Sequence, residues 1–196
     1  MPTWGWILIA AIVAVAVVAV IVAGTRSNRK RTEGLKQRFG PEYERTVAVS
    51  GDQTAAEKEL AARERNRDKL DIVALSPEAH QRYTASWRKV QTDFVDDPAG
   101  AVADADRLVT IVMDERGYPV DDFDRRADDI SVDHPAVVEN YRAAHAIYLS
   151  QNAGDVDTEA QRQAFVHYRA LFEQLLETAK PTNKSNDTDT SQEARA

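Results

Sequence analysis

One apolar stretch near the N-terminus constrains this chain more than any other part of its sequence. The run from Trp4 to Gly24, WGWILIAAIVAVAVVAVIVAG, contains no charged side chain. About 20 apolar residues at a rise of 1.5 Å each are enough to cross a hydrocarbon core of roughly 30 Å. A buried core helix would carry a polar face, and this run has none. The run therefore predicts a transmembrane helix that anchors the chain to the lipid bilayer.

The residues around this run predict how the chain is oriented. The expected membrane-interface residues are two tryptophans and the four cations that follow the run: Trp4, Trp6, Arg26, Arg29, Lys30 and Arg31. Short segments rich in Lys and Arg stay in the cytoplasm, and no Lys or Arg precedes the run. We expect a single-pass protein of the inner or plasma membrane, with its N-terminus outside and its C-terminal domain in the cytoplasm.

The alternative is a cleaved signal peptide, which would make the chain an exported envelope protein. The small residues Val22, Ala23 and Gly24 fit a cleavage site. The first residues carry no positive side chain, and the apolar run exceeds the roughly 7 to 15 residues of a usual signal peptide. These two departures favour the anchor.

Charge and composition divide the chain into four parts. Residues 1–25 are the anchor, residues 26–75 a basic juxtamembrane segment with a charged stalk, and residues 76–178 an acidic domain; residues 179–196 are a polar tail that is expected to be disordered. Residues 26–75 hold 12 Lys and Arg against 9 Asp and Glu, whereas residues 76–178 hold 10 against 20. An acidic domain repels phosphate backbones, so we expect no binding of nucleic acid.

The stalk is predicted from a helix that is charged nearly all round. Thr54 is the expected N-cap, with Glu57 three residues later as in a capping box. Glu59 and Arg63 stand four apart and can pair along the helix. The few apolar positions favour a solvated helix over a coiled coil.

Four amphipathic helices are predicted between residues 76 and 178, and no strand pattern competes with them. Ser76 and Asp97 each precede a proline, which is typical of an N-cap followed by the first helical residue. The apolar stripes at helical spacing are Tyr83, Trp87, Val90 and Phe94; Ala101, Val102, Ala105, Leu108, Val109, Val112 and Met113; Val137, Val138, Tyr141, Ala144, Tyr148 and Leu149; and Phe165, Tyr168, Leu171, Phe172, Leu175 and Leu176. The fold class is therefore all-α, a compact antiparallel helical bundle.

The stretch DDFDRRADDISVDH, residues 121–134, has the ligand density of a metal site. As a calcium loop it fails, because Ala127 stands where glycine is needed and Asp133 where glutamate is needed. We instead predict a short helix with Arg125 and Arg126 paired to aspartates on its outer face, and Asp133 as the next N-cap. The alternative is a weak divalent-ion surface, whose candidates are Asp122, Asp124, Asp129 and Asp133.

A small-ligand or acid-base site between the helices is a further alternative. His145 lies between Tyr141 and Tyr148 at helical spacing, and with Tyr168 it could line a pocket between helices. His80, His134 and His167 fall off the apolar stripes. Cysteine is absent, which excludes disulfides and thiolate metal sites, and no phosphate-binding loop or catalytic serine motif occurs. We therefore expect neither a cofactor nor a catalytic residue.

The stretches RYTASWRKVQTDFVDDPAGAVADADRLVTIVMDERGYP and ISVDHPAVVENYRAAH resemble a family of uncharacterised bacterial membrane-anchored or secreted proteins. Its members carry one N-terminal apolar segment followed by a helical domain. The resemblance covers roughly residues 75 to 175 and implies one coherent helical domain. The family has no assigned activity, so the resemblance implies no site residue.

These features together predict a membrane-anchored interaction or scaffold module that binds a protein partner and is not an enzyme. The first alternative is an enzyme or ligand-binding bundle with its pocket at Tyr141, His145 and Tyr168. The second alternative is the exported protein described above.

Overall fold

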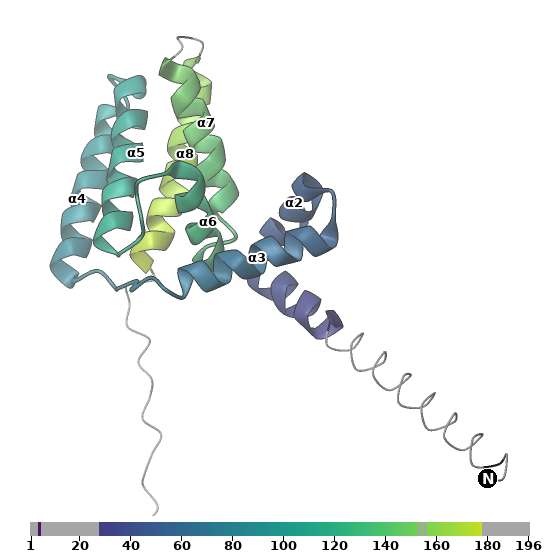
Figure 1. The fold of residues 1–196 in the computed structure, drawn as a ribbon. Helices are drawn as coiled ribbons and strands as arrows, with labels where there is room; N and C mark the ends of the chain where they lie inside the picture. Colours follow the sequence, from purple (N-terminus) through teal and green to yellow (C-terminus); the bar gives the residue numbers. More distant parts are fainter. Residues whose placement is uncertain (1–3, 5–27, 153, 155, 178–196) are drawn as a thin grey trace, which may run out of the picture.

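The computed structural model describes residues 4, 28–152, 154 and 156–177 (Figure 1). Within this part of the chain every regular element is a helix and no strand forms, which confirms the all-α class. The predicted span lies outside the described residues except for Trp4, as does the polar tail. None of the described helices is long and apolar enough to cross a membrane.

Four helices form the predicted bundle and run side by side in Figure 1. They are α4 (Pro77–Asp93), α5 (Pro98–Glu115), α7 (Val138–Asn152) and α8 (Thr158–Glu177). Helix α8 packs along α5 and α7, while α4 packs along α5. The shorter helix α6 (Phe123–Asp133) lies against α7 and connects the two halves of the bundle.

The local signals that start these helices act as predicted. The hydroxyl of Ser76 accepts a hydrogen bond from the Ala79 amide at 3.1 Å, and proline follows as the first helical residue. The carboxylate of Asp97 accepts from the Gly100 amide at 2.9 Å in the same way. Both N-caps are confirmed, because each satisfies an amide that lacks a partner within its own helix.

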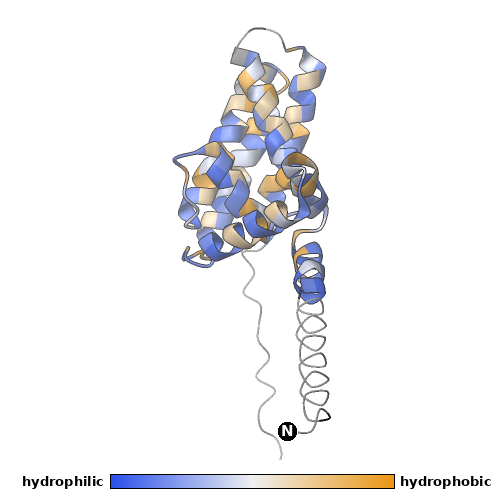
Figure 2. Ribbon diagram, turned by 45° about the vertical axis from the view of Figure 1, so that its right-hand side comes forward, coloured by the Kyte–Doolittle hydropathy of each residue, from blue (hydrophilic) through white to orange (hydrophobic). Residues whose placement is uncertain are grey.

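The apolar stripes meet in one core. Hydrophilic and hydrophobic residues alternate along the bundle helices (Figure 2). Trp87 lies at the centre of an aromatic group, with its ring stacked on Phe165 and Phe172 at centroid distances of 5.0 and 4.6 Å. Most of the predicted stripe residues are buried, Phe94, Val137 and Tyr148 are partly buried, and Leu149 near the end of α7 is exposed.

An N-terminal arm, residues 28–67, packs at one end of the bundle (Figure 1). It consists of helix 28–39, α2 (Pro41–Ser50) and α3 (Gln53–Arg67). Its own small core contains residues from all three helices and one residue of α6: Leu35, Phe39, Tyr43, Leu60 and Val132.

The structure differs from the solvated stalk that the charge pattern favoured. Helix α3 packs against both α2 and α6, and it buries Ala56, Leu60, Ala61 and Arg63. The few apolar residues of α3 are sufficient for this packing, because the neighbouring helices supply the aromatic side chains of Phe39 and Tyr43. The N-cap is also different: Asp52 accepts from the amides of Thr54 and Ala55, so the prediction of Thr54 was wrong.

The turn that follows α5 depends on a glycine. Gly117 has a φ of +93°, and a Cβ atom there would lie 2.5 Å from the carbonyl oxygen of Asp71. We expect Gly117→Ala to lower the free energy of unfolding by about 1–3 kcal/mol, measured by denaturant titration of the full chain in detergent.

The matched control is Gly34→Ala in helix 28–39. No heavy atom lies within 4 Å of a Cβ built at Gly34, so alanine should be neutral or stabilising there. Equal effects of the two substitutions would contradict the assigned role of Gly117.

Candidate functional site

The residues of the predicted pocket come together around an aspartate of α5. The carboxylate of Asp106 accepts a hydrogen bond from the Tyr168 hydroxyl at 2.8 Å and lies 3.4 Å from Nδ1 of His145. The rings of Tyr141 and Tyr168 meet edge to face at 6.3 Å, and Phe123 stacks on His145 at 3.7 Å. We call Asp106, His145 and Tyr168 the Asp106 cluster.

The Asp106 cluster lies where α5, α7 and α8 pack together, with Phe123 of α6 stacked against it. Tyr141 and Tyr168 are fully buried, and the side chains of His145 and Asp106 are only 15% and 16% exposed. Burial and the neighbouring Asp106 carboxylate raise the pKa of the Tyr168 phenol, which therefore stays protonated and donates to that carboxylate. The arrangement suits a hydrogen-bonded core better than proton transfer to a ligand.

Sequence reasoning found three residues of this junction and missed Asp106. Asp106 occupies a helical position between Val102 and Val109, inside the apolar stripe of α5. A carboxylate at a core-facing position could have indicated a hydrogen-bonded site, because a buried acid requires a partner.

Removing the hydroxyl of Tyr168 should reveal the strength of this contact. We expect Tyr168→Phe to lower the free energy of unfolding by about 1.5–3 kcal/mol, since a hydrogen bond to a charged group is lost. Denaturant titration measures the change, and Tyr148→Phe on α7 serves as the control. A loss no larger than that of the control would contradict the assigned hydrogen bond.

The acidic segment 121–134 folds as the predicted short helix, but its charges pair differently. Arg126 is buried, donates to the carbonyl of Val120 at 3.0 Å, and lies over the rings of Phe123 and Tyr141. The predicted surface pairing of Arg126 was therefore wrong. Helix α6 has a neighbour on each side, the bundle and α3, so its buried face is wider than one apolar stripe indicates.

The four candidate metal ligands lie in four different environments. Asp122 caps α6 by accepting from the Arg125 amide at 2.8 Å, and Asp124 is exposed. Asp129 is buried, which raises its carboxyl pKa. Asp133 is the last residue of α6 and not the next N-cap: it accepts from Arg67 at 2.8 Å and from the Tyr118 hydroxyl at 2.6 Å. No described group of three or more His, Cys, Asp or Glu side chains could hold a metal ion.

A buried group of charges joins the arm to the bundle. Arg142 of α7 binds both oxygens of Glu42 on α2, at 2.8 and 2.9 Å, and Arg63 of α3 binds Glu42 at 2.8 Å. Asp128 of α6 completes the group with an oxygen 3.0 Å from Arg63. We call Glu42, Arg63, Asp128 and Arg142 the ion cluster.

The ion cluster is shielded from water at its centre. The Glu42 side chain is 1% exposed, and those of Arg63 and Arg142 are 10% and 14% exposed. Burial opposes ionisation of Glu42, but the hydrogen bonds and charges of Arg142 and Arg63 outweigh it and hold the pKa of Glu42 below its ordinary value. Four helices are thereby fixed by one carboxylate and its partners.

A buried histidine adds sensitivity to acid near the end of α6. His134 is 3% exposed; burial and the nearby Arg116 lower its pKa to about 4. The unfolded chain therefore binds a proton at a higher pH than the folded chain does. Folding stability should fall as the pH decreases from about 6.5 toward about 4, by about 3 kcal/mol in total for this group.

Denaturant titrations between pH 7 and pH 4 can isolate this contribution. The His134→Gln variant should lose less stability over this interval than the unmodified chain does. His167→Gln is the control, since His167 lies outside this buried region. Identical pH profiles for the chain and for His134→Gln would contradict the depressed pKa.

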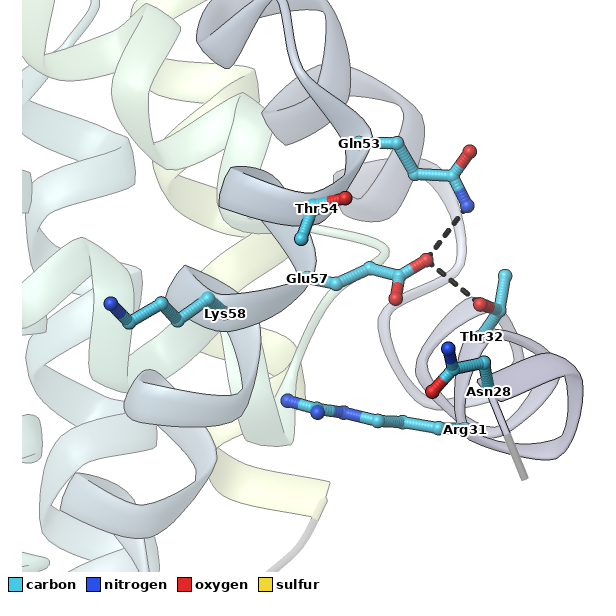
Figure 3. Close-up of a pocket in the computed structure, with 7 residues that line it drawn as sticks. All are labelled: Asn28, Arg31, Thr32, Gln53, Thr54, Glu57 and Lys58. Carbon is cyan, nitrogen blue, oxygen red and sulfur yellow. Dashed lines mark hydrogen bonds between the residues drawn. The ribbon is translucent and has the colours of Figure 1, made fainter. Parts of the chain in front are cut away.

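A cavity opens between helix 28–39 and the first two turns of α3 (Figure 3). It has a volume of about 470 Å³ and is lined by Asn28, Arg31, Thr32, Gln53, Thr54, Glu57 and Lys58. One oxygen of Glu57 accepts from Thr32, Tyr43 and Gln53 at 2.8 to 2.9 Å. Of the predicted membrane-interface residues, Trp4, Arg29, Lys30 and Arg31 are described and exposed, whereas Trp6 and Arg26 lie outside the described residues.

Comparisons with known protein families, with curated proteins and with solved structures found no match to this chain. The resemblance to a bacterial family stays an expectation, and the geometry alone supports a functional proposal.

Proposed function

We propose that this chain is a single-pass, membrane-anchored interaction module that presents an acidic helical bundle at the cytoplasmic face of a membrane. The apolar run Trp4–Gly24 and the cations that follow it support the anchor. The net charge of residues 76–178, with 10 Lys and Arg against 20 Asp and Glu, supports a protein partner with a basic surface.

The ion cluster is the observation that carries this proposal. Residue 28, the first described residue of the arm, follows the apolar run Trp4–Gly24 by four positions, and Glu42 of the arm is held by Arg142 of the bundle. A buried and bidentate pair of this kind fixes geometry more strongly than an exposed contact does. The bundle is therefore held in one orientation relative to the arm, and a module that positions a partner at a membrane requires such a fixed connection.

Site-directed labelling tests the anchor and its direction. The chain contains no cysteine, so Ser185→Cys introduces a single reporter in the tail and Thr3→Cys a matched reporter before the apolar run. In intact cells a membrane-impermeant maleimide should label Thr3→Cys and leave Ser185→Cys unlabelled until lysis, and the protein should keep its full mass.

Two outcomes would contradict this proposal. Labelling of Ser185→Cys in intact cells would reverse the assigned orientation. A mass lower by about the first 24 residues would indicate a cleaved signal peptide and an exported protein.

A further inference from the structure

The cavity between helix 28–39 and α3 has an unbalanced set of charges. Arg31 and Lys58 line it, and neither forms an ion pair within 4.0 Å with a described residue. Glu57 is the single carboxylate of its lining. In Figure 3 the Lys58 side chain extends away from helix 28–39, so Arg31 and Glu57 are the charged side chains that a ligand between the two helices would meet. One cation and one anion suit a ligand that carries an anionic group and a cationic group together.

The Glu57 carboxylate is held in place and keeps one oxygen for a ligand. Its Oε1 atom accepts all three hydrogen bonds from Thr32, Tyr43 and Gln53, and no described residue donates to Oε2. The hydrogen bond from Gln53 is the largest influence that lowers the pKa of Glu57, so the group is ionised. Figure 3 shows Arg31 reaching from helix 28–39 toward α3 beneath this carboxylate.

The position of the cavity along the chain limits its distance from a membrane surface. Asn28, which lines the cavity, is four residues beyond Gly24, the end of the apolar run. Four residues span at most about 14 Å even when fully extended. With the run across a bilayer, the cavity therefore lies within reach of lipid headgroups, where Lys and Arg favour phosphate groups.

We propose that this cavity binds a phosphate ester carrying a primary ammonium, supplied by the headgroup of an ethanolamine phospholipid. Arg31 binds the phosphate, and the free oxygen of Glu57 accepts from the ammonium. The lipid source rests on the proposed membrane anchor. The recognition chemistry itself does not, because a free ester of the same type carries the same two groups.

Native mass spectrometry of the full chain in maltoside micelles tests this site. Phospholipids with identical acyl chains and ethanolamine, choline or glycerol headgroups are added, and the bound fractions are compared. We expect the ethanolamine lipid to bind about fivefold more tightly than the choline lipid, which has no N–H donor. Soluble glycerophosphoethanolamine, added in excess, should displace it.

Two variants and one control separate the contributions of the lining. Arg31→Gln should weaken binding of all three lipids, whereas Glu57→Gln should remove the preference for ethanolamine over choline. Lys69→Gln lies beyond α3, away from the cavity, and should change neither.

Equal binding of the three headgroups, or binding that is insensitive to Arg31→Gln and Glu57→Gln, would overturn the proposal. Binding of the soluble ester without binding of the lipid would overturn the lipid source. Exposure of Ser185→Cys in intact cells would instead contradict the proposed topology and leave a positive binding result in place.

Discussion

Glu42→Ala should lower the free energy of unfolding by about 3–5 kcal/mol, the typical effect of removing one partner from a buried ion pair. The substitution leaves Arg63 and Arg142 without their shared carboxylate, while their side chains stay only 10% and 14% exposed. Asp128 is a weak substitute for Glu42: it lies 3.0 Å from Arg63, but it is 40% exposed and 3.9 Å from Arg142. Denaturant titration of the full chain in detergent, followed by circular dichroism, measures the change.

The control for Glu42→Ala is a carboxylate in an exposed ion pair. Glu159 pairs with Arg162 on the surface of α8, where both side chains are more than half exposed. Glu159→Ala should leave the unfolding free energy nearly unchanged, since exposed pairs contribute little. Similar losses for the two alanine variants would contradict the role of the ion cluster.

Trp87→Ala should lower the free energy of unfolding by about 3–5 kcal/mol, as is usual for removing a large aromatic side chain from a core. Trp87 is 6% exposed and connects α4 to α8 through its contacts with Phe165 and Phe172. Alanine would leave a cavity between these helices. The same denaturant titration measures the loss.

Val166 offers a matched control for Trp87 on α8. Val166 follows Phe165 directly, but it is 49% exposed. Val166→Ala should have a much smaller effect, because the half-exposed Val166 side chain removes little apolar area from water when the chain folds. A mild effect of Trp87→Ala, comparable with that of Val166→Ala, would show that the aromatic group does not hold α4 in place.

The bundle could be predicted because its signals are local. The helical spacing of residues such as Tyr83, Trp87 and Val90 places them on one face of one helix, whatever that helix packs against. Ser76 and Asp97 likewise act on amides three residues away. Both kinds of signal depend only on residues near one another in the sequence.

The pairing of charges could not be predicted in this way. Glu42 and Arg142 are 100 residues apart, and nothing in either local sequence indicates the other. Arg126 has aspartates at helical spacing, yet it turns inward, because the packing of α6 between α3 and the bundle decides which face is buried. Local charge patterns therefore identified charged helices but not their partners.

The ion cluster should make the arm and the bundle one rigid unit, and the distribution of distances between them tests this rigidity. Spin labels on cysteines at Gln37 of helix 28–39 and Gln91 of α4, both exposed, report this distance in the reconstituted full chain by pulsed electron resonance. The ion cluster predicts one narrow distribution that broadens in the Glu42→Ala variant. A broad distribution in the unmodified background would contradict a fixed connection between the arm and the bundle.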